Sequence, residues 1–206
     1  QMQMPFIERM AKSLYSGTRS LARGEPVGDG LGPLVAANLI ANTKVVEIED
    51  DIMMAKITMR GRNVFVIKAK GPGGRLGVPG KAVEKISRKN KISRIISVDA
   101  AAKLEGEKTG SIAEGVGVAM GGPGVERSYI EGVAVKNKIP LDSIIVKMSP
   151  EEAIMPMKKA VKDSVSGVME SINRSLDRTK KGENVIIVGV GNTSGVGNSG
   201  KAAKDA

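Results

Sequence analysis

Two aspartates stand at positions where an α/β enzyme would present a carboxylate. Asp29 lies in a glycine-rich turn, residues 28–33, just before a short apolar run. Asp99 follows the apolar run 95–98, which indicates a strand that ends at this residue. Because open α/β sheets bind ligands at the carboxyl ends of their strands, we expect both carboxylates at that edge.

Two neighbouring carboxylates can support two kinds of chemistry. Both cannot ionise cheaply at short range, so one takes a raised pKa and acts as an acid while the other activates water. The pair would then hydrolyse a peptide or amide bond. Alternatively, Asp29 and Asp99 could hold a divalent cation between them. A purely structural role stays open, because an aspartate in a turn before a helix is a common cap.

A basic glycine-rich loop indicates a different class of function. Residues 71–80 contain five glycines and two prolines between a predicted strand and a predicted helix. Backbone N–H groups at Gly73 and Gly74, with the side chains of Arg75 and Lys81, could cradle a phosphate or a carboxylate. This alternative is a non-catalytic binding module for a phosphate-bearing or other anionic ligand. An ordinary structural turn would have the same composition.

Charge is concentrated in the same part of the chain. Residues 60–94 contain eleven Lys or Arg against one acid, Glu84, an excess that equals the net charge of +10 for all 206 residues. This segment is the main candidate for facing an anionic partner, although charge runs also serve simply as solvated helix faces. The chain has only four aromatic residues, two Tyr and two Phe, which disfavours nucleic-acid modes that stack bases.

The residue types that are missing limit the chemistry. The chain has no Cys and no His, so any catalysis must use carboxylates, lysines or hydroxyls. Absence of Cys fits a cytoplasmic protein. No apolar run approaches the roughly 20 residues of a spanning helix, so we expect membrane attachment only through a segment upstream of Gln1.

The elements that must position these residues follow from the apolar periodicity. Apolar runs alternate with helical patterns, which predicts a three-layer α/β domain spanning 1–206, with a mostly parallel sheet flanked by helices. An N-terminal helix within residues 1–23 packs on it. Ser149 and Glu152 form a predicted capping box that starts a long helix, kinked at Pro156 and ending near Gly182. The predicted helices are 6–22, 31–41, 81–89, 125–135 and 150–182, and the predicted strands are 45–49, 52–59, 64–67, 95–98, 110–120, 143–148 and 185–188.

The order of the motifs resembles one enzyme superfamily. Gly28-Asp29-Gly30-Leu31-Gly32-Pro33, then Val98-Asp99-Ala100, Gly110-Ser111-Ile112 and Gly121-Gly122-Pro123-Gly124-Val125 resemble the germination-protease and hydrogenase-maturation-protease superfamily. The segment 187–193 is similar to the strand and loop that precede the first motif there, which implies a circular permutation.

This resemblance implies a phosphorylase/hydrolase-like fold and peptidase-like activity with Asp29 and Asp99 as the acidic pair. We expect Gly28, Gly30, Asn192 and Thr193 to line the ligand site beside them. Because the chain has no His, only an oxygen-ligand version of the metal site of this superfamily is implied.

The chain also resembles, over most of its length, an uncharacterised archaeal family, domain of unknown function 1512, which supplies no function. The expected partner is a peptide or an anionic small molecule rather than nucleic acid, and no cofactor beyond a divalent cation is indicated.

Overall fold

The computed structural model describes residues 3–117 and 125–200 of the chain, and for 125–127 only the backbone. In this part, seven strands form one sheet in the order β1-β2-β3-β7-β4-β6-β5. The central pairings β3–β7, β7–β4 and β4–β6 are parallel, and the outer pairings are antiparallel. The sheet is therefore mixed, and the α/β class with flanking helices is confirmed. The strands are β1 Val46–Glu49, β2 Ile52–Met59, β3 Arg62–Ala69, β4 Ile92–Ala102, β5 Ile112–Val116, β6 Leu141–Met148 and β7 Asn184–Gly189.

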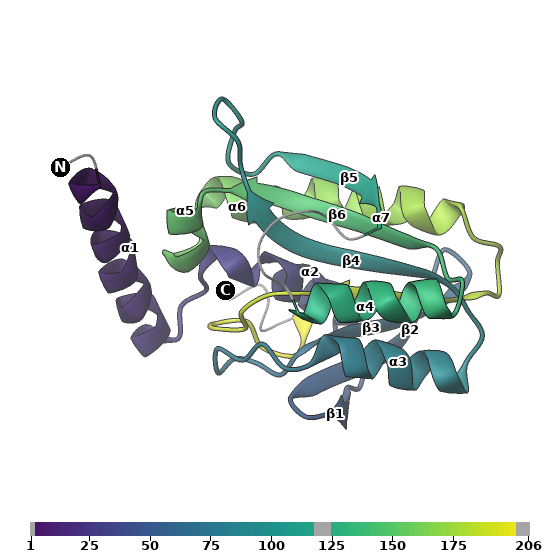
Figure 1. Cartoon of the computed structure of the whole chain (residues 1–206). Coiled ribbons are helices and arrows are strands. Elements are labelled where there is room, and N and C mark those ends of the chain that lie inside the picture. The colour runs from purple at the N-terminus through teal and green to yellow at the C-terminus, as the bar shows by residue number, and fades with distance from the viewer. Residues whose placement is uncertain (1–2, 118–124, 201–206) are drawn as a thin grey trace.

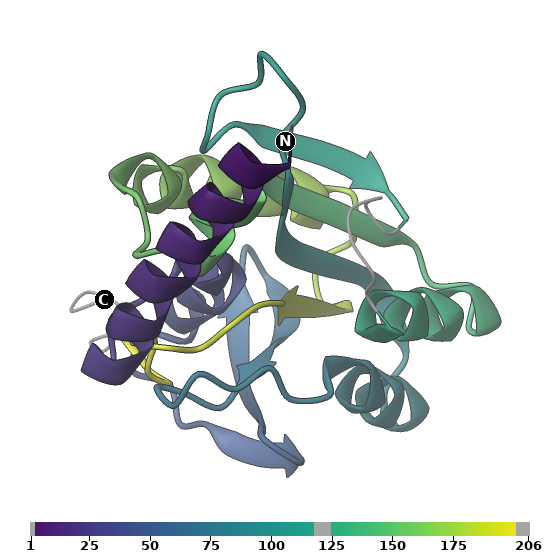
Figure 2. The same ribbon diagram turned by 60° about the vertical axis from the view of Figure 1, so that its left-hand side comes forward.

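Helices cover both faces of this sheet, and each face has its own apolar core. On one face, α2 (Leu31–Ile40) and α7 (Val165–Asp177) pack on alternate strand residues such as Val66 and Ile187. On the other face, α3 (Pro79–Lys89) and α4 (Val125–Lys136) pack on residues such as Ile67 and Val188. The two layers of helices are visible on either side of the strands in Figures 1 and 2. Every residue of α2 except Asn38 is buried, as its nearly all-apolar sequence predicts.

The N-terminal helix α1 (Met4–Arg23) lies at one end of the molecule, where it contacts α5 (Pro150–Ile154) (Figure 1). The two helices approach closely at Gly17, where an added Cβ would lie 2.1 Å from the carbonyl oxygen of Ile154. None of the helices described is long and apolar enough to cross a membrane.

The long helix predicted from residue 150 is wrong, because the chain forms three separate helices. The capping box at Ser149 is confirmed and starts α5, but α5 ends at Ile154, and α6 (Lys159–Asp163) and α7 follow. Between α5 and α6, Pro156 forms an isolated β-bridge with Val27, and Met157 donates its N–H to the carbonyl of Pro26 at 2.8 Å. The proline thus stops the helix rather than kinking it.

Two predicted strands differ most from the observed strands in where they end. The strand predicted to end before Asp99 continues to Ala102, because the neighbouring strand β6 pairs with it as far as Met148. Asp99 is therefore within β4 rather than at its end. The strand predicted over 110–120 is β5, which ends at Val116, and residues 118–120 lie outside the described part of the chain.

Candidate functional site

The turn that contains Asp29 needs glycine for structural reasons. Residues Gly28–Gly30 form a short 3-10 helix, η1, directly before α2. A Cβ on Gly32 would lie 2.2 Å from the carbonyl oxygen of Val190 and 2.6 Å from that of Val98. Added Cβ atoms at Gly28 and Gly30 would likewise meet backbone oxygens, of Glu152 and Asn192, at 2.2 Å and 3.0 Å. Glycine is required here because the backbone of this turn packs directly on other backbone.

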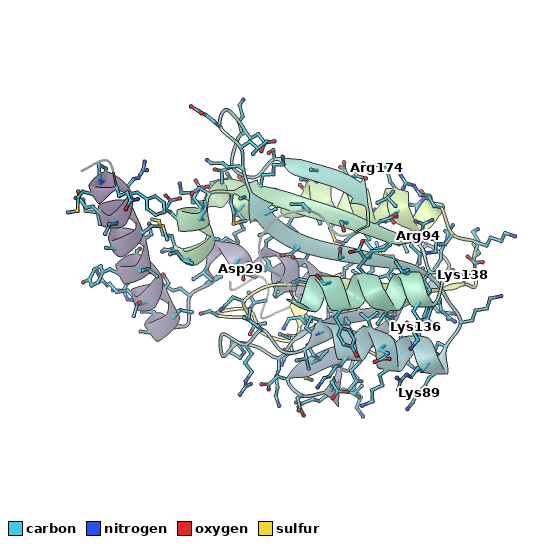
Figure 3. The ribbon with its side chains drawn as sticks, viewed as in Figure 1. Asp29, Lys89, Arg94, Lys136, Lys138 and Arg174 are labelled. Carbon is cyan, nitrogen blue, oxygen red and sulfur yellow. The ribbon has the colours of Figure 1, made fainter. Side chains whose placement is uncertain are left out.

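Asp29 is tied to the loop that follows β7. Its carboxylate Oδ2 accepts the N–H of Asn192 at 2.9 Å, so these two predicted site residues are adjacent. Figure 3 shows Asp29 at the end of the molecule that lies toward α1. A carboxylate that accepts a backbone N–H is stabilised in its charged form, which suits a structural clamp as well as a base.

Asp99 is buried in the sheet. Its Oδ1 accepts the N–H of Ala100 at 2.7 Å. Val98 and Ala100 belong to the core under α2 and α7, so the alternation along β4 directs Asp99 to the face covered by α3 and α4. Asp29 precedes α2 on the other face. Within residues 3–117 and 125–200, no group of three or more acidic, His or Cys residues could hold a metal ion. A two-aspartate site therefore stays a prediction.

The loop 71–80 is fastened to the loop after β7 by two side chains. Thr193 is fully buried, and its Oγ1 accepts the N–H of Arg75 at 2.9 Å and donates to the carbonyl of Lys70 at 3.0 Å. Asn198 accepts the N–H of Gly71 at 2.9 Å. The N–H groups of Gly71 and Arg75 in this loop thus already have protein acceptors.

The other residues predicted to bind an anion do not all lie together: Gly73, Gly74 and Arg75 belong to the loop, whereas Lys81 belongs to α3. Gly73 is exposed, and the carbonyl of Gly74 accepts the Nδ2 of Asn192 at 3.4 Å. The guanidinium of Arg75 pairs with Asp51 at 3.2 Å. Lys81 does not join them, because it belongs to α3 and lines a different part of the surface.

Lys68 is a buried cation that is not among the residues predicted for the site. It is fully buried at the carboxyl end of β3, and its Nζ donates to the carbonyl of Ala69 at 2.7 Å and to Oδ1 of Asn198 at 3.0 Å. Burial lowers the pKa of Lys68 to about 8. The signal in the sequence is a lysine directly after the apolar run 64–67.

A groove along α3 is lined by four of the eleven basic residues of the segment 60–94, together with Lys56. Three hollows with volumes of about 340, 220 and 420 Å³ share lining residues and run from the start of β7 along α3 to its N-terminal half. We call this surface the α3 groove. Its charged lining comprises the basic residues Lys56, Lys81, Lys85, Arg88 and Lys89 and the acidic residues Glu49 and Glu84.

Both acids of the α3 groove are already paired. Glu84 accepts hydrogen bonds from the hydroxyl of Tyr129 at 2.7 Å and from Arg88 at 2.6 Å, and these contacts lower the pKa of Glu84. Glu49 pairs with Lys85 at 3.4 Å.

The groove is therefore left with a net positive charge. Three lysines carry it: Lys56, which lies over the ring of Phe65 at 5.3 Å, Lys81 and Lys89. Figure 3 shows Lys89 at the same end of the molecule as Lys136 and Lys138, opposite Asp29.

Comparison with known proteins places these features in a family. The family described as domain of unknown function (DUF1512) C-terminal matches residues 27–197. The chain belongs to this family. The match to DUF1512 includes Asp29, Asp99, Lys68 and the α3 groove, and it begins after α1.

Other comparisons give little beyond the family. No curated protein matches the chain. Among solved structures, it is similar to a proteasome-assembly chaperone homologue from Mycobacterium tuberculosis, with 12% identity over 72% of this chain and 81% of that one. The TM-score is 0.47, and a likeness at this level carries no argument about function. The resemblance to germination and maturation proteases receives no support from these matches.

Proposed function

We propose that this domain is a non-catalytic binding module that takes a phosphate-bearing ligand in the α3 groove. The observation that carries the proposal is the excess of positive charge there: both lining acids are paired, and among the described residues that line the groove none is an acidic partner of Lys56, Lys81 or Lys89. Ammonium groups on open surfaces bind anions as point charges, and phosphates are among the ligands they bind best.

The spacing of the lysines indicates an extended anion. Lys81, Lys85 and Lys89 follow one another at steps of four along α3 and form one stripe. At a rise of 1.5 Å per residue, the backbones of Lys81 and Lys89 are about 12 Å apart. A chain of phosphates can contact both lysines with their side chains extended, whereas a single phosphate would require both side chains to bend toward each other.

Calorimetric titration with sodium tripolyphosphate at low salt tests the proposal. We expect binding by the wild-type chain, and a loss of about tenfold or more in affinity in the double variant Lys81→Ser/Lys89→Ser, because two charge-assisted contacts disappear. The matched control is Lys162→Ser/Lys180→Ser, which removes the same charge from exposed positions outside the groove. No binding by the wild type, or an equal loss in the control, would contradict the proposal.

A peptide hydrolase that uses Asp29 and Asp99 is the second candidate. The contact between Asp29 and Asn192 favours it, because the resemblance to the maturation proteases implies this neighbourhood. Its test is the cleavage of fluorescently labelled casein with and without Mg²⁺ or Mn²⁺, compared with the variant Asp99→Asn. An absence of cleavage by the wild type under both conditions would remove this candidate.

A further inference from the structure

Helix α1 docks on the rest of the molecule through small residues rather than through its apolar side. Its buried positions are Ser13, Gly17 and Ser20, which share one face at steps of three and four. Gly17 meets the backbone of Ile154 in α5. An amphipathic surface helix normally buries its apolar stripe, so this docking leaves that stripe without a partner in the described structure.

The exposed apolar face of α1 is wide. At 100° per residue, its members cover about a third of the helix circumference. Each of them exposes between 48% and 67% of its surface. The face consists of Met4, Ile7, Leu14, Tyr15 and Leu21, whereas Phe6 points in the same direction as Ser13 and Gly17.

The third side of α1 is basic. Arg9, Lys12, Arg19 and Arg23 lie there with one acid of the helix, Glu8, which pairs with Lys12 at 2.6 Å. Arg23 pairs with Glu25, just after the helix, at 3.7 Å. The guanidinium of Arg19 lies 5.7 Å from the ring centre of Tyr15, at the border between the basic and apolar sides. The helix therefore presents apolar and positive surfaces next to each other.

We propose that α1 lies in the plane of an anionic lipid bilayer, with its apolar face in the acyl boundary and its basic side among the headgroups. Helices that bind in this way have large apolar residues on one side and lysines and arginines on the other, as α1 does. Figures 1 and 2 show α1 at the margin of the molecule, with the body on one side only, so a flat surface can reach it.

A second copy of the chain fits α1 less well than a bilayer does. A coiled-coil seam is a narrow stripe of two positions per heptad, whereas here Met4 and Tyr15 widen the apolar face beyond Ile7, Leu14 and Leu21. Two copies of α1 would also bring together helices that both carry excess positive charge. Anionic lipid instead complements that charge.

Vesicle flotation with the full chain tests this surface. We expect binding to vesicles of phosphatidylcholine with about 30% phosphatidylglycerol, because anionic lipid attracts basic segments, and weaker binding to phosphatidylcholine alone. The variant Ile7→Gln/Leu14→Gln should lower the partition coefficient about a hundredfold, because two large apolar side chains no longer enter the bilayer. The variant Arg9→Gln/Arg19→Gln should weaken binding to the anionic vesicles and leave binding to the neutral vesicles unchanged.

The matched control places the same change on exposed apolar residues elsewhere. Leu104 and Val135 are 71% and 72% exposed, and Leu104→Gln/Val135→Gln should bind vesicles as the wild type does. Circular dichroism checks that all variants fold. A wild type that does not bind vesicles, or a control that loses binding equally, overturns the proposal. A lipid-free dimer in light scattering that Ile7→Gln/Leu14→Gln converts to a monomer would make a second copy the partner and also overturn it.

Discussion

The carboxylate of Asp29 accepts a hydrogen bond at 2.9 Å from the backbone N–H of Asn192, which lies 163 residues later in the chain. This bond joins the turn before α2 to the loop after β7. The same loop holds the 71–80 loop through Thr193 and Asn198. One contact at Asp29 therefore helps to fix the whole carboxyl edge of the central strands.

Replacing Asp29 should destabilise the fold. In Asp29→Ala the N–H of Asn192 loses a charged acceptor in a half-buried position, and we expect the free energy of unfolding to fall by about 1–3 kcal/mol. Urea denaturation measures this change. Asp50→Ala, at an exposed position, is the control and should stay within about 0.5 kcal/mol of wild type. Equal stability of Asp29→Ala would mean that the bond contributes nothing.

A methyl group at Gly32 should be more damaging. Its Cβ would lie 2.2 Å and 2.6 Å from two backbone oxygens, so we expect Gly32→Ala to lose about 3 kcal/mol or more, since overpacking against backbone cannot relax easily. Gly132→Ala in α4 is the opposite case, because its Cβ meets nothing within 4 Å. That helix substitution should gain about 0.5–1 kcal/mol in thermal or urea unfolding.

Lys68 should make the stability rise with pH above neutrality. Its pKa in the folded protein is about 8, below the ordinary lysine value of 10.5, so between these values the unfolded chain binds the extra proton. The free energy of unfolding should increase by about 2 kcal/mol between pH 8 and pH 9.5. Comparing the wild type with Lys68→Met over this range isolates the effect, because the variant should lack it. Parallel pH curves for the two proteins would contradict the assignment.

Glu152 should confer stability that disappears in acid. Burial raises the pKa of Glu152, but hydrogen bonds from Lys158, the N–H of Ser149 and Thr109 outweigh burial and hold it at about 2. The stabilisation is therefore full above pH 4.5 and is lost as the pH falls toward 2. Glu152→Gln should unfold more easily at pH 7 and lose less stability between pH 5 and pH 2.5. If Glu152→Gln has the same free energy of unfolding as the wild type at pH 7 and at pH 2.5, Glu152 does not have this stabilising role.

Local signals predicted most elements correctly. The strands β1 and β2, the helix α2 and the capping box at Ser149 depend on neighbouring residues, and the structure confirms each of them. The break after Ile154 depends instead on a bridge between Pro156 and Val27, which are far apart in sequence. The continuation of β4 past Asp99 likewise depends on a distant partner, β6.

The candidate sites also combine features that the sequence predicted with features that depend on contacts between distant residues. The proximity of Asp29 and Asn192 was predicted from a resemblance in motif order, and the bond between them agrees with it. In the sequence, the only sign of the α3 groove was the excess of basic residues. The groove itself could not be predicted, because its lining combines Lys56 from β2 with residues of α3 that the sheet topology brings together. Thr193 was expected to line the ligand site and Asn198 was not named, so neither was predicted to hold the 71–80 loop, because these contacts join residues 118 and 127 positions apart in the sequence.

The position of β7 has a consequence for the synthesis of the protein. β3 and β4 are both paired with β7, so the strand that joins the two halves of the sheet is the last one along the described chain. While the ribosome is still making residues before 184, each half ends in a strand whose hydrogen-bonding edge is open. Such edges pair readily with other chains. A nascent chain of this domain therefore carries two aggregation-prone edges until β7 has emerged.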